Sequence, residues 1–225
     1  MHIRAGRLIL TLVFPVLLVI MGVRLVMTPI FLQFEYNRPD FPADFYGLTR
    51  EERLYYAPFA LDYLILNKPL DYLADLRFDD GTPLFNAREL RHMHDVQLLT
   101  RSAFAAGLAS GILAVIIGLL LMRTPEGRIQ LRLGLRDGAL LTIGLIVTLV
   151  LMALFAWDVF FTGFHEMFFE SGTWYFLYSD TLIRLFPEQF WFDAAILVGV
   201  CALLGSIVTL IVGRVWDKSA HVKKS

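Results

Sequence analysis

The sequence predicts an all-α membrane protein with four transmembrane helices. Hydrophobic residues make up 57% of the 225 residues, well above the usual share in soluble domains. A membrane-crossing helix needs about 20 mostly apolar residues. Four windows meet this requirement, and they span residues 8–32, 103–122, 139–161 and 194–212.

The first window resembles a secretory signal peptide because Arg4 and Arg7 precede it. It is too long for the apolar region of such a peptide, and no small-x-small cleavage site lies near its end. We therefore expect residues 8–32 to be retained as the first span.

The basic residues predict the orientation of the spans. They gather before span one, between spans two and three, and after span four, at Arg4, Arg7, Arg123, Arg128, Arg132, Arg136, Arg214, Lys218, Lys223 and Lys224. The positive-inside rule assigns these places and both termini to the cytoplasm. Residues 33–97 and 162–192 are then extracytoplasmic parts of a single integral domain, 1–225, in the plasma membrane. The net charge of -1 gives no general attraction for nucleic acid.

The first extracytoplasmic segment is too small to hold a robust core alone, and we expect short helices in it. Thr49 with Glu52 fits a capping box, and the helix it begins should stop before Pro69. Asp80-Gly81 is typical of a hairpin turn, which predicts short strands around "LRFDDGTPLF".

A second capping pattern, Asn86 with Glu89, predicts a helix from Ala87 that runs unbroken into span two. His92 then lies about 15 Å above the fully apolar part of that span, near the lipid headgroups. His165 lies a few residues beyond span three, in a segment dense in aromatic residues that is typical of the membrane interface.

These two histidines are the candidate catalytic pair. His92 and Asp95 share a helix face, so the carboxylate could fix the imidazole tautomer and leave one nitrogen as a base. With His165 opposite, the pair could bracket a lipid ester as general base and oxyanion donor. The alternative is a plain salt-bridged helix start in which Asp95 pairs with Arg88 and Arg91.

A zinc site is the rival chemistry. On a helix His92 and His94 face different ways, and "HEMFF" lacks the second histidine of a His-Glu-x-x-His motif. Zinc would need His92, His94 and His165 to converge in space. The lone Cys201 supports neither a disulfide framework nor a cysteine metal motif.

Other charges near the same level are candidates for orienting the site or binding substrate, and Arg91 beside His92 is one of them. Asp158 is predicted at the outer end of span three, where it could orient the site or pair with Arg24. A charged stripe at intervals of four could hold a substrate amine or phosphate, or form a salt-bridged interfacial helix, and it comprises Asp180, Arg184 and Glu188.

Four motifs in order along the chain carry a family resemblance: "EYNRPDFPADFYGL", "LFNARELRHMHDV", "FHEMFF" and "WYFLYSDTLIRLFPEQFW". Together they resemble the bacterial integral-membrane family of the lipoprotein intramolecular transacylase, Lit. The resemblance implies an acyltransferase without a cofactor. It would move the sn-2 acyl chain of a diacylglyceryl-modified lipoprotein to the α-amine of the N-terminal cysteine, with His92 and His165 as essential residues. The alternatives are a zinc-dependent membrane hydrolase of lipid amides or peptides and a non-enzymatic membrane partner protein.

Overall fold

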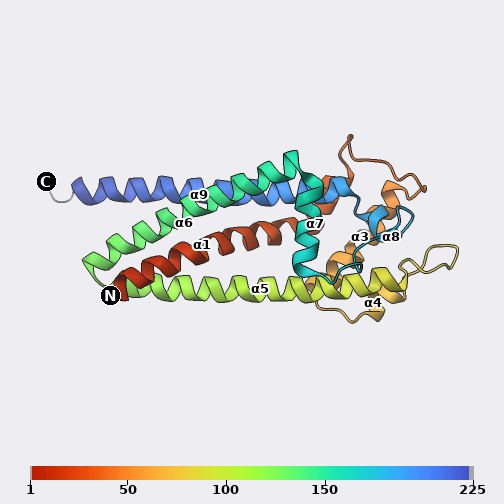
Figure 1. Cartoon of the computed structure of the whole chain (residues 1–225), viewed down its shortest axis with the longest axis horizontal. Coiled ribbons are helices and arrows are strands. Elements are labelled where there is room, and N and C mark those ends of the chain that lie inside the picture. The colour runs from red at the N-terminus through yellow and green to blue at the C-terminus, as the bar shows by residue number, and fades with distance from the viewer. Residues whose placement is uncertain (1, 223–225) are drawn as a thin grey trace. The chain divides into compact units, whose positions relative to one another are not determined.

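A computed structural model describes residues 2–222 (Figure 1). Within that range the secondary structure is helical and contains no β-strand. The helices are α1 (His2–Val26), α2 (Pro29–Tyr36), α3 (Arg50–Ile65), α4 (Asp71–Ala74), α5 (Ala87–Leu121), α6 (Pro125–Phe155), α7 (Trp157–Phe168), α8 (Thr181–Leu185) and α9 (Glu188–Val222). In the described chain α1, α5, α6 and α9 are long and apolar enough to cross a membrane, which confirms the predicted fold class. Lys223 and Lys224, used above to orient span four, lie outside the described residues.

The chain forms two compact units. The span unit comprises residues 1–23, 104–151 and 196–225, and the site unit comprises residues 24–103 and 152–195. Each long helix therefore contributes its apolar length to the span unit and one end to the site unit.

Two predicted span boundaries were wrong. The first apolar window continues to Leu32, but α1 ends at Val26 because Thr28 caps a new helix and Pro29 lacks the N–H that would extend the old one. The third window continues to residue 161, but α6 ends at Phe155 and a separate helix begins at Trp157. Hydropathy alone does not register these breaks, because apolar residues continue through both.

Glycines allow the helices of the span unit to approach closely. A Cβ added at Gly107 would lie 2.6 Å from Ile20 Cγ2, and one at Gly138 would lie 2.7 Å from Phe14 Cβ. Such separations are shorter than real carbon contacts. In lipid, where apolar burial gives little drive, close backbone packing of this kind is a main source of helix association.

The site unit contains the predicted capping box at the start of α3. Thr49 Oγ1 accepts from Glu52 N at 3.1 Å, and Glu52 Oε2 accepts from Thr49 N at 2.7 Å. The turn at Asp80-Gly81 is also present, with Gly81 at a φ of 83°. Within residues 2–222 it closes only an isolated bridge, so the short strands predicted around it were wrong.

Candidate active site

The start of α5 positions the first histidine. Asn86 Oδ1 accepts from Glu89 N at 3.1 Å, and Glu89 Oε2 accepts from Asn86 N at 2.7 Å, so the predicted cap is present. At 1.5 Å per residue the 35 residues of α5 extend about 52 Å, well beyond the roughly 30 Å of a bilayer core. The polar first turns, which carry His92, therefore lie outside the membrane-spanning part.

His92 is buried among aromatic rings, with 7% of its surface exposed. Its ring centroid lies 5.0 Å from that of Phe169 and 5.3 Å from that of Phe176. The His165 ring faces it at a centroid distance of 6.1 Å and an interplanar angle of 19°. The structure thus brings together the two histidines that the sequence singled out, from positions 73 residues apart.

His165 stands in the last turn of α7 and has a defined tautomer. Its Nδ1 lies 2.7 Å from the main-chain oxygen of Phe161. A carbonyl oxygen can only accept, so Nδ1 carries the proton and donates it, and Nε2 keeps its lone pair. In the neutral imidazole, Nε2 is therefore the nitrogen of His165 that can accept a hydrogen bond.

Burial keeps both imidazoles neutral. Desolvation, together with the neighbouring His165, lowers the pKa of His92 to about 4. Burial also lowers the pKa of His165, against an opposing effect of the hydrogen bond to Phe161. Both side chains are then uncharged at neutral pH, the state in which an imidazole can accept a proton.

The proposed orienting role of Asp95 has no support in the geometry. Asp95 makes no hydrogen bond to His92 within residues 2–222, and His92 Nδ1 is buried without any partner. The His92 ring packs into the aromatic cluster, whereas Asp95 stays partly exposed. Arg91 is exposed as well.

The three histidines do not converge on a metal site. His94 is exposed, as expected for a residue two positions from His92 on a helix. Among the residues that the structure describes, no group of three or more His, Cys, Asp or Glu side chains could hold an ion.

Asp180, Arg184 and Glu188 do not form one charged stripe, because α8 ends at Leu185 and Glu188 begins α9. Asp180 accepts from Arg88 Nη2 at 2.8 Å, and Arg184 Nε donates to Asp44 Oδ2 at 3.1 Å. These pairs link segments far apart in sequence, so both residues have structural partners that the sequence did not indicate.

Asp158 is exposed in the first turn of α7, which corrects its predicted place at the end of span three. It forms no ion pair with Arg24 in the described part of the chain, and Arg24 Nη1 instead donates to the main-chain oxygen of Met27 at 3.0 Å. The predicted pairing of these two charges was therefore wrong.

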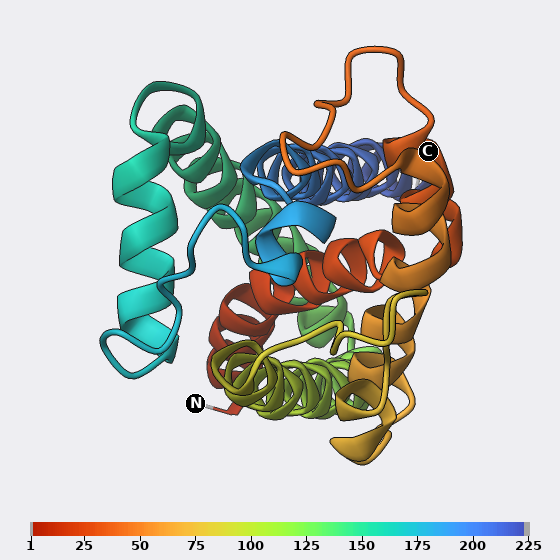
Figure 2. The same cartoon turned by 90° about the vertical axis from the view of Figure 1, so that its right-hand side faces the viewer.

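Glu89 joins the starts of α5 and α8. Its Oε1 accepts from Leu182 N at 2.6 Å, while its Oε2 caps its own helix, and the residue is 1% exposed. A second hydrogen bond joins the same two helix starts, because Asp180 at the start of α8 accepts from Asn86 Nδ2 at the start of α5 at 3.1 Å. These two hydrogen bonds anchor the end of the loop that leads from α7 to α8, and the course of that loop can be followed in Figure 2.

That loop supplies the site residues that sequence reasoning missed. Trp174 lies with its ring centroid 4.7 Å from that of His165, and its buried Nε1 has no hydrogen-bond partner among the described residues. The Phe176 ring packs against the His92 ring on one side. The guanidinium carbon of Arg88 lies over the same Phe176 ring, 5.7 Å from its centroid. The aromatic density of "WYFLY" was a signal, but it also fits an interfacial belt.

Comparison with known proteins gives the same family as the motifs. The family model of the lipoprotein intramolecular transacylase Lit matches residues 8–191. An uncharacterised protein of Aquifex aeolicus is 31% identical over 211 residues, which cover 94% of each chain. The structure of the membrane integral lipoprotein intramolecular transacylase Lit from Bacillus cereus superposes with a TM-score of 0.80 at 21% identity, covering 98% of both chains. A variant of that protein with one histidine replaced by alanine gives a TM-score of 0.62 at 19% identity, over 98% of this chain and 96% of the other. The extent of the family match shows that the chain belongs to the Lit family of integral membrane proteins.

Proposed function

We propose that the chain is a lipoprotein intramolecular transacylase. Membership of the Lit family implies acyltransferase activity in general. The specific reaction proposed is transfer of the sn-2 acyl chain of a diacylglyceryl-modified lipoprotein to the α-amine of its N-terminal cysteine. The observation that carries the proposal is the facing pair of neutral histidines, one of them held by Phe161 in the tautomer of a base.

The reaction needs a base and an oxyanion donor but no enzyme nucleophile. The amine nitrogen attacks the ester carbonyl, a C–N bond forms, and the bond from carbon to the sn-2 oxygen breaks. Since donor and acceptor belong to one molecule, positioning supplies much of the rate. The proton lost by the amine is returned to the sn-2 oxygen, which leaves as a hydroxyl.

The geometry favours His165 as the base. Its Nε2 is free to take the amine proton because Nδ1 is committed to Phe161. The ring centroids are 6.1 Å apart and the ring planes are nearly parallel, so in-plane nitrogens on the same side of the pair could both reach one reacting group that lies beside the rings. His92 would donate to the developing oxyanion, and Trp174 Nε1 is a second unused donor beside the pair.

The distribution of basic residues predicts how the protein is oriented in the membrane. From the positive-inside rule we expect both termini in the cytoplasm and His92 and His165 on the extracytoplasmic side. The N-terminal cysteine of a diacylglyceryl lipoprotein is held at a membrane surface by its acyl chains. The substrate would then reach the histidines at headgroup depth without leaving the bilayer.

The test is to express the chain with a model lipoprotein in cells that lack N-acyl transfer. Substrate and product are isomers of equal mass, so the N-terminal peptide must be analysed by tandem mass spectrometry and by labelling with an amine-reactive reagent. We expect an acyl group on the cysteine nitrogen and loss of labelling. A peptide that keeps its free amine and both ester-linked chains would refute the proposal.

The pH dependence of the rate follows from the depressed pKa of each histidine. A histidine with a lowered pKa stays neutral as the pH falls and is protonated only below that lowered value, which lies under the ordinary 6.5 for the base His165 and near 4 for His92. The substrate amine, with a reference pKa of about 7.7 to 8.0, titrates first. At subsaturating substrate, log rate should rise with unit slope up to about pH 8, without an additional break at 6.5. A slope of two below pH 6.5 that changes to one above it would show that a histidine titrates normally.

A further inference from the structure

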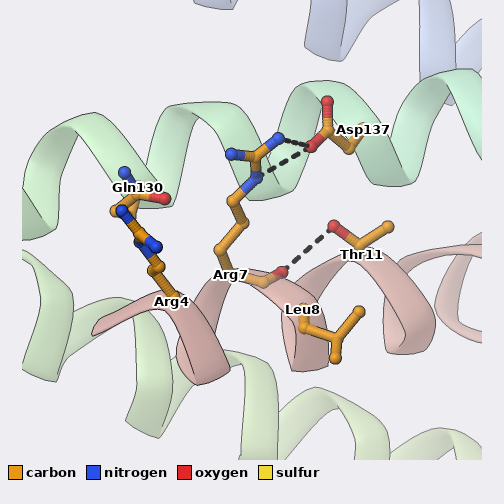
Figure 3. Close-up of a pocket in the computed structure, with 6 residues that line it drawn as sticks. All are labelled: Arg4, Arg7, Leu8, Thr11, Gln130 and Asp137. Carbon is orange, nitrogen blue, oxygen red and sulfur yellow. Dashed lines mark hydrogen bonds and ion pairs between the residues drawn. The ribbon is translucent and has the colours of Figure 1, made fainter. Parts of the chain in front are cut away.

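A pocket in the span unit lies between the start of α1 and the first half of α6 (Figure 3). Its volume is ≈ 510 Å³. The lining residues are Arg4, Arg7, Leu8, Thr11, Gln130 and Asp137. None of them belongs to the site unit, so the pocket is separate from the histidine pair.

A close helix crossing borders the pocket. A Cβ added at Gly134 would lie 3.1 Å from the main-chain oxygen of Arg7. Thr11 Oγ1 donates to that oxygen at 3.0 Å and lies 3.3 Å from the Gly134 oxygen. Packing at Gly134 therefore fixes the two helices beside the pocket and holds its polar lining in place.

The charges of the lining are only partly satisfied. Arg7 donates through Nε, at 2.9 Å, and through Nη2 to Asp137 Oδ2, which leaves Nη1 free of any bond in the described structure. Arg4 is exposed and makes no hydrogen bond or ion pair within residues 2–222. Gln130 Oε1 is buried and has no partner there. One pocket thus presents an unpaired cation, spare guanidinium donors and an unsatisfied acceptor.

We propose that this pocket binds the headgroup of a glycerophospholipid. Its phosphate would lie between Arg4 and Arg7 Nη1, and a hydroxyl or ammonium group at the far end of the headgroup would donate to Gln130 Oε1. Charged hydrogen bonds are the strong ones, and a buried acceptor without a partner favours any ligand that supplies a donor.

The position of the pocket relative to the membrane favours a lipid ligand over a free anion. Arg4 and Arg7 stand directly before the apolar run of α1, which places them where that helix meets the headgroups. Leu8, in the same lining, is 59% exposed and offers apolar surface to a glycerol or acyl chain. Basic pockets between spans on the cytoplasmic side are suited to lipid headgroups.

The test uses the full chain purified in a neutral detergent and titrated with short-chain phosphatidylglycerol, which carries both a phosphate and hydroxyl donors. We expect saturable binding to one site. Arg4→Gln should weaken it about tenfold, the usual value of one charge-assisted hydrogen bond. Arg123→Gln removes the same charge from the α5–α6 connection, outside the pocket, and should leave the affinity unchanged. Equal weakening by both substitutions, or no saturable binding, would overturn the proposal.

Two further comparisons identify the ligand. Phosphatidylcholine has the phosphate but no headgroup donor, so it should bind more weakly than phosphatidylglycerol. Gln130→Leu should abolish that preference while phosphatidylcholine binding persists, which also shows that the variant is folded. Inorganic phosphate that competes as well as the lipid would assign the pocket to a free anion and reject a lipid ligand. A preference that survives Gln130→Leu would reject the assigned role of Gln130.

Discussion

Replacing His165 with glutamine is expected to lower the rate of acyl transfer by about 10²–10⁴-fold, the usual contribution of a positioned general base. Glutamine keeps a polar side chain of similar size and can still reach the Phe161 oxygen, but it cannot accept a proton. His92→Phe, which keeps an aromatic ring among Phe169 and Phe176 but has no N–H to donate, should cause a loss of the same order, because an oxyanion donor contributes about 10²–10³-fold. The measurement is the rate of N-acyl cysteine formation by purified protein in detergent.

His94 provides a matched control for both substitutions. It lies two residues from His92 on the same helix but is exposed, and the structure assigns it no contact with the aromatic cluster. His94→Gln should therefore retain the activity of the unmodified chain. If the three substitutions lowered the rate equally, the helix start rather than the histidine pair would carry the effect.

Replacing Glu89 with alanine is expected to lower the free energy of unfolding by about 3 kcal/mol or more. The buried main-chain N–H of Leu182 and the partly buried one of Asn86 would both lose their acceptor; a buried unsatisfied group costs about 1–3 kcal/mol, and a lost helix cap costs about 1 kcal/mol. Because Glu89 helps to hold the loop that carries Trp174, the rate of acyl transfer should fall as well. Chemical denaturation in detergent micelles measures the first effect.

The exposed capping box of α3 is the control for this prediction. Glu52 accepts from Thr49 N at 2.7 Å, the same length as the cap bond of Glu89, but its hydrogen bonds are open to solvent. Glu52→Ala should cost about 1 kcal/mol, as exposed caps usually do, and leave the rate unchanged. Equal destabilisation by the two substitutions would contradict the role given to burial and to the link with Leu182.

The features that the sequence predicts are those encoded by neighbouring residues. Four apolar runs predicted four long helices, and the pairs Thr49 with Glu52 and Asn86 with Glu89 predicted two helix starts correctly. Each signal acts within a few residues, where spacing translates directly into contact.

The features that the sequence did not predict depend on partners far along the chain or on the main chain. Glu89 looks like an ordinary cap residue, and its bond to Leu182 spans 93 positions. Asp95 has the spacing to orient His92, but the aromatic cluster that surrounds His92 comes from α7 and the following loop. Residue spacing along α5 does not reveal that the His92 ring packs against this cluster and not against Asp95.

The hydrogen bond between His165 and Phe161 also affects how the site would appear in comparisons of relatives. The acceptor is a main-chain oxygen four residues earlier, which every amino acid possesses. Selection can therefore preserve the tautomer without preserving the residue type at position 161. The hydrogen bond itself therefore depends on the helical geometry of α7, whereas any constraint on the residue type at 161 comes from the Phe161 ring, whose centroid lies 4.1 Å from that of His165.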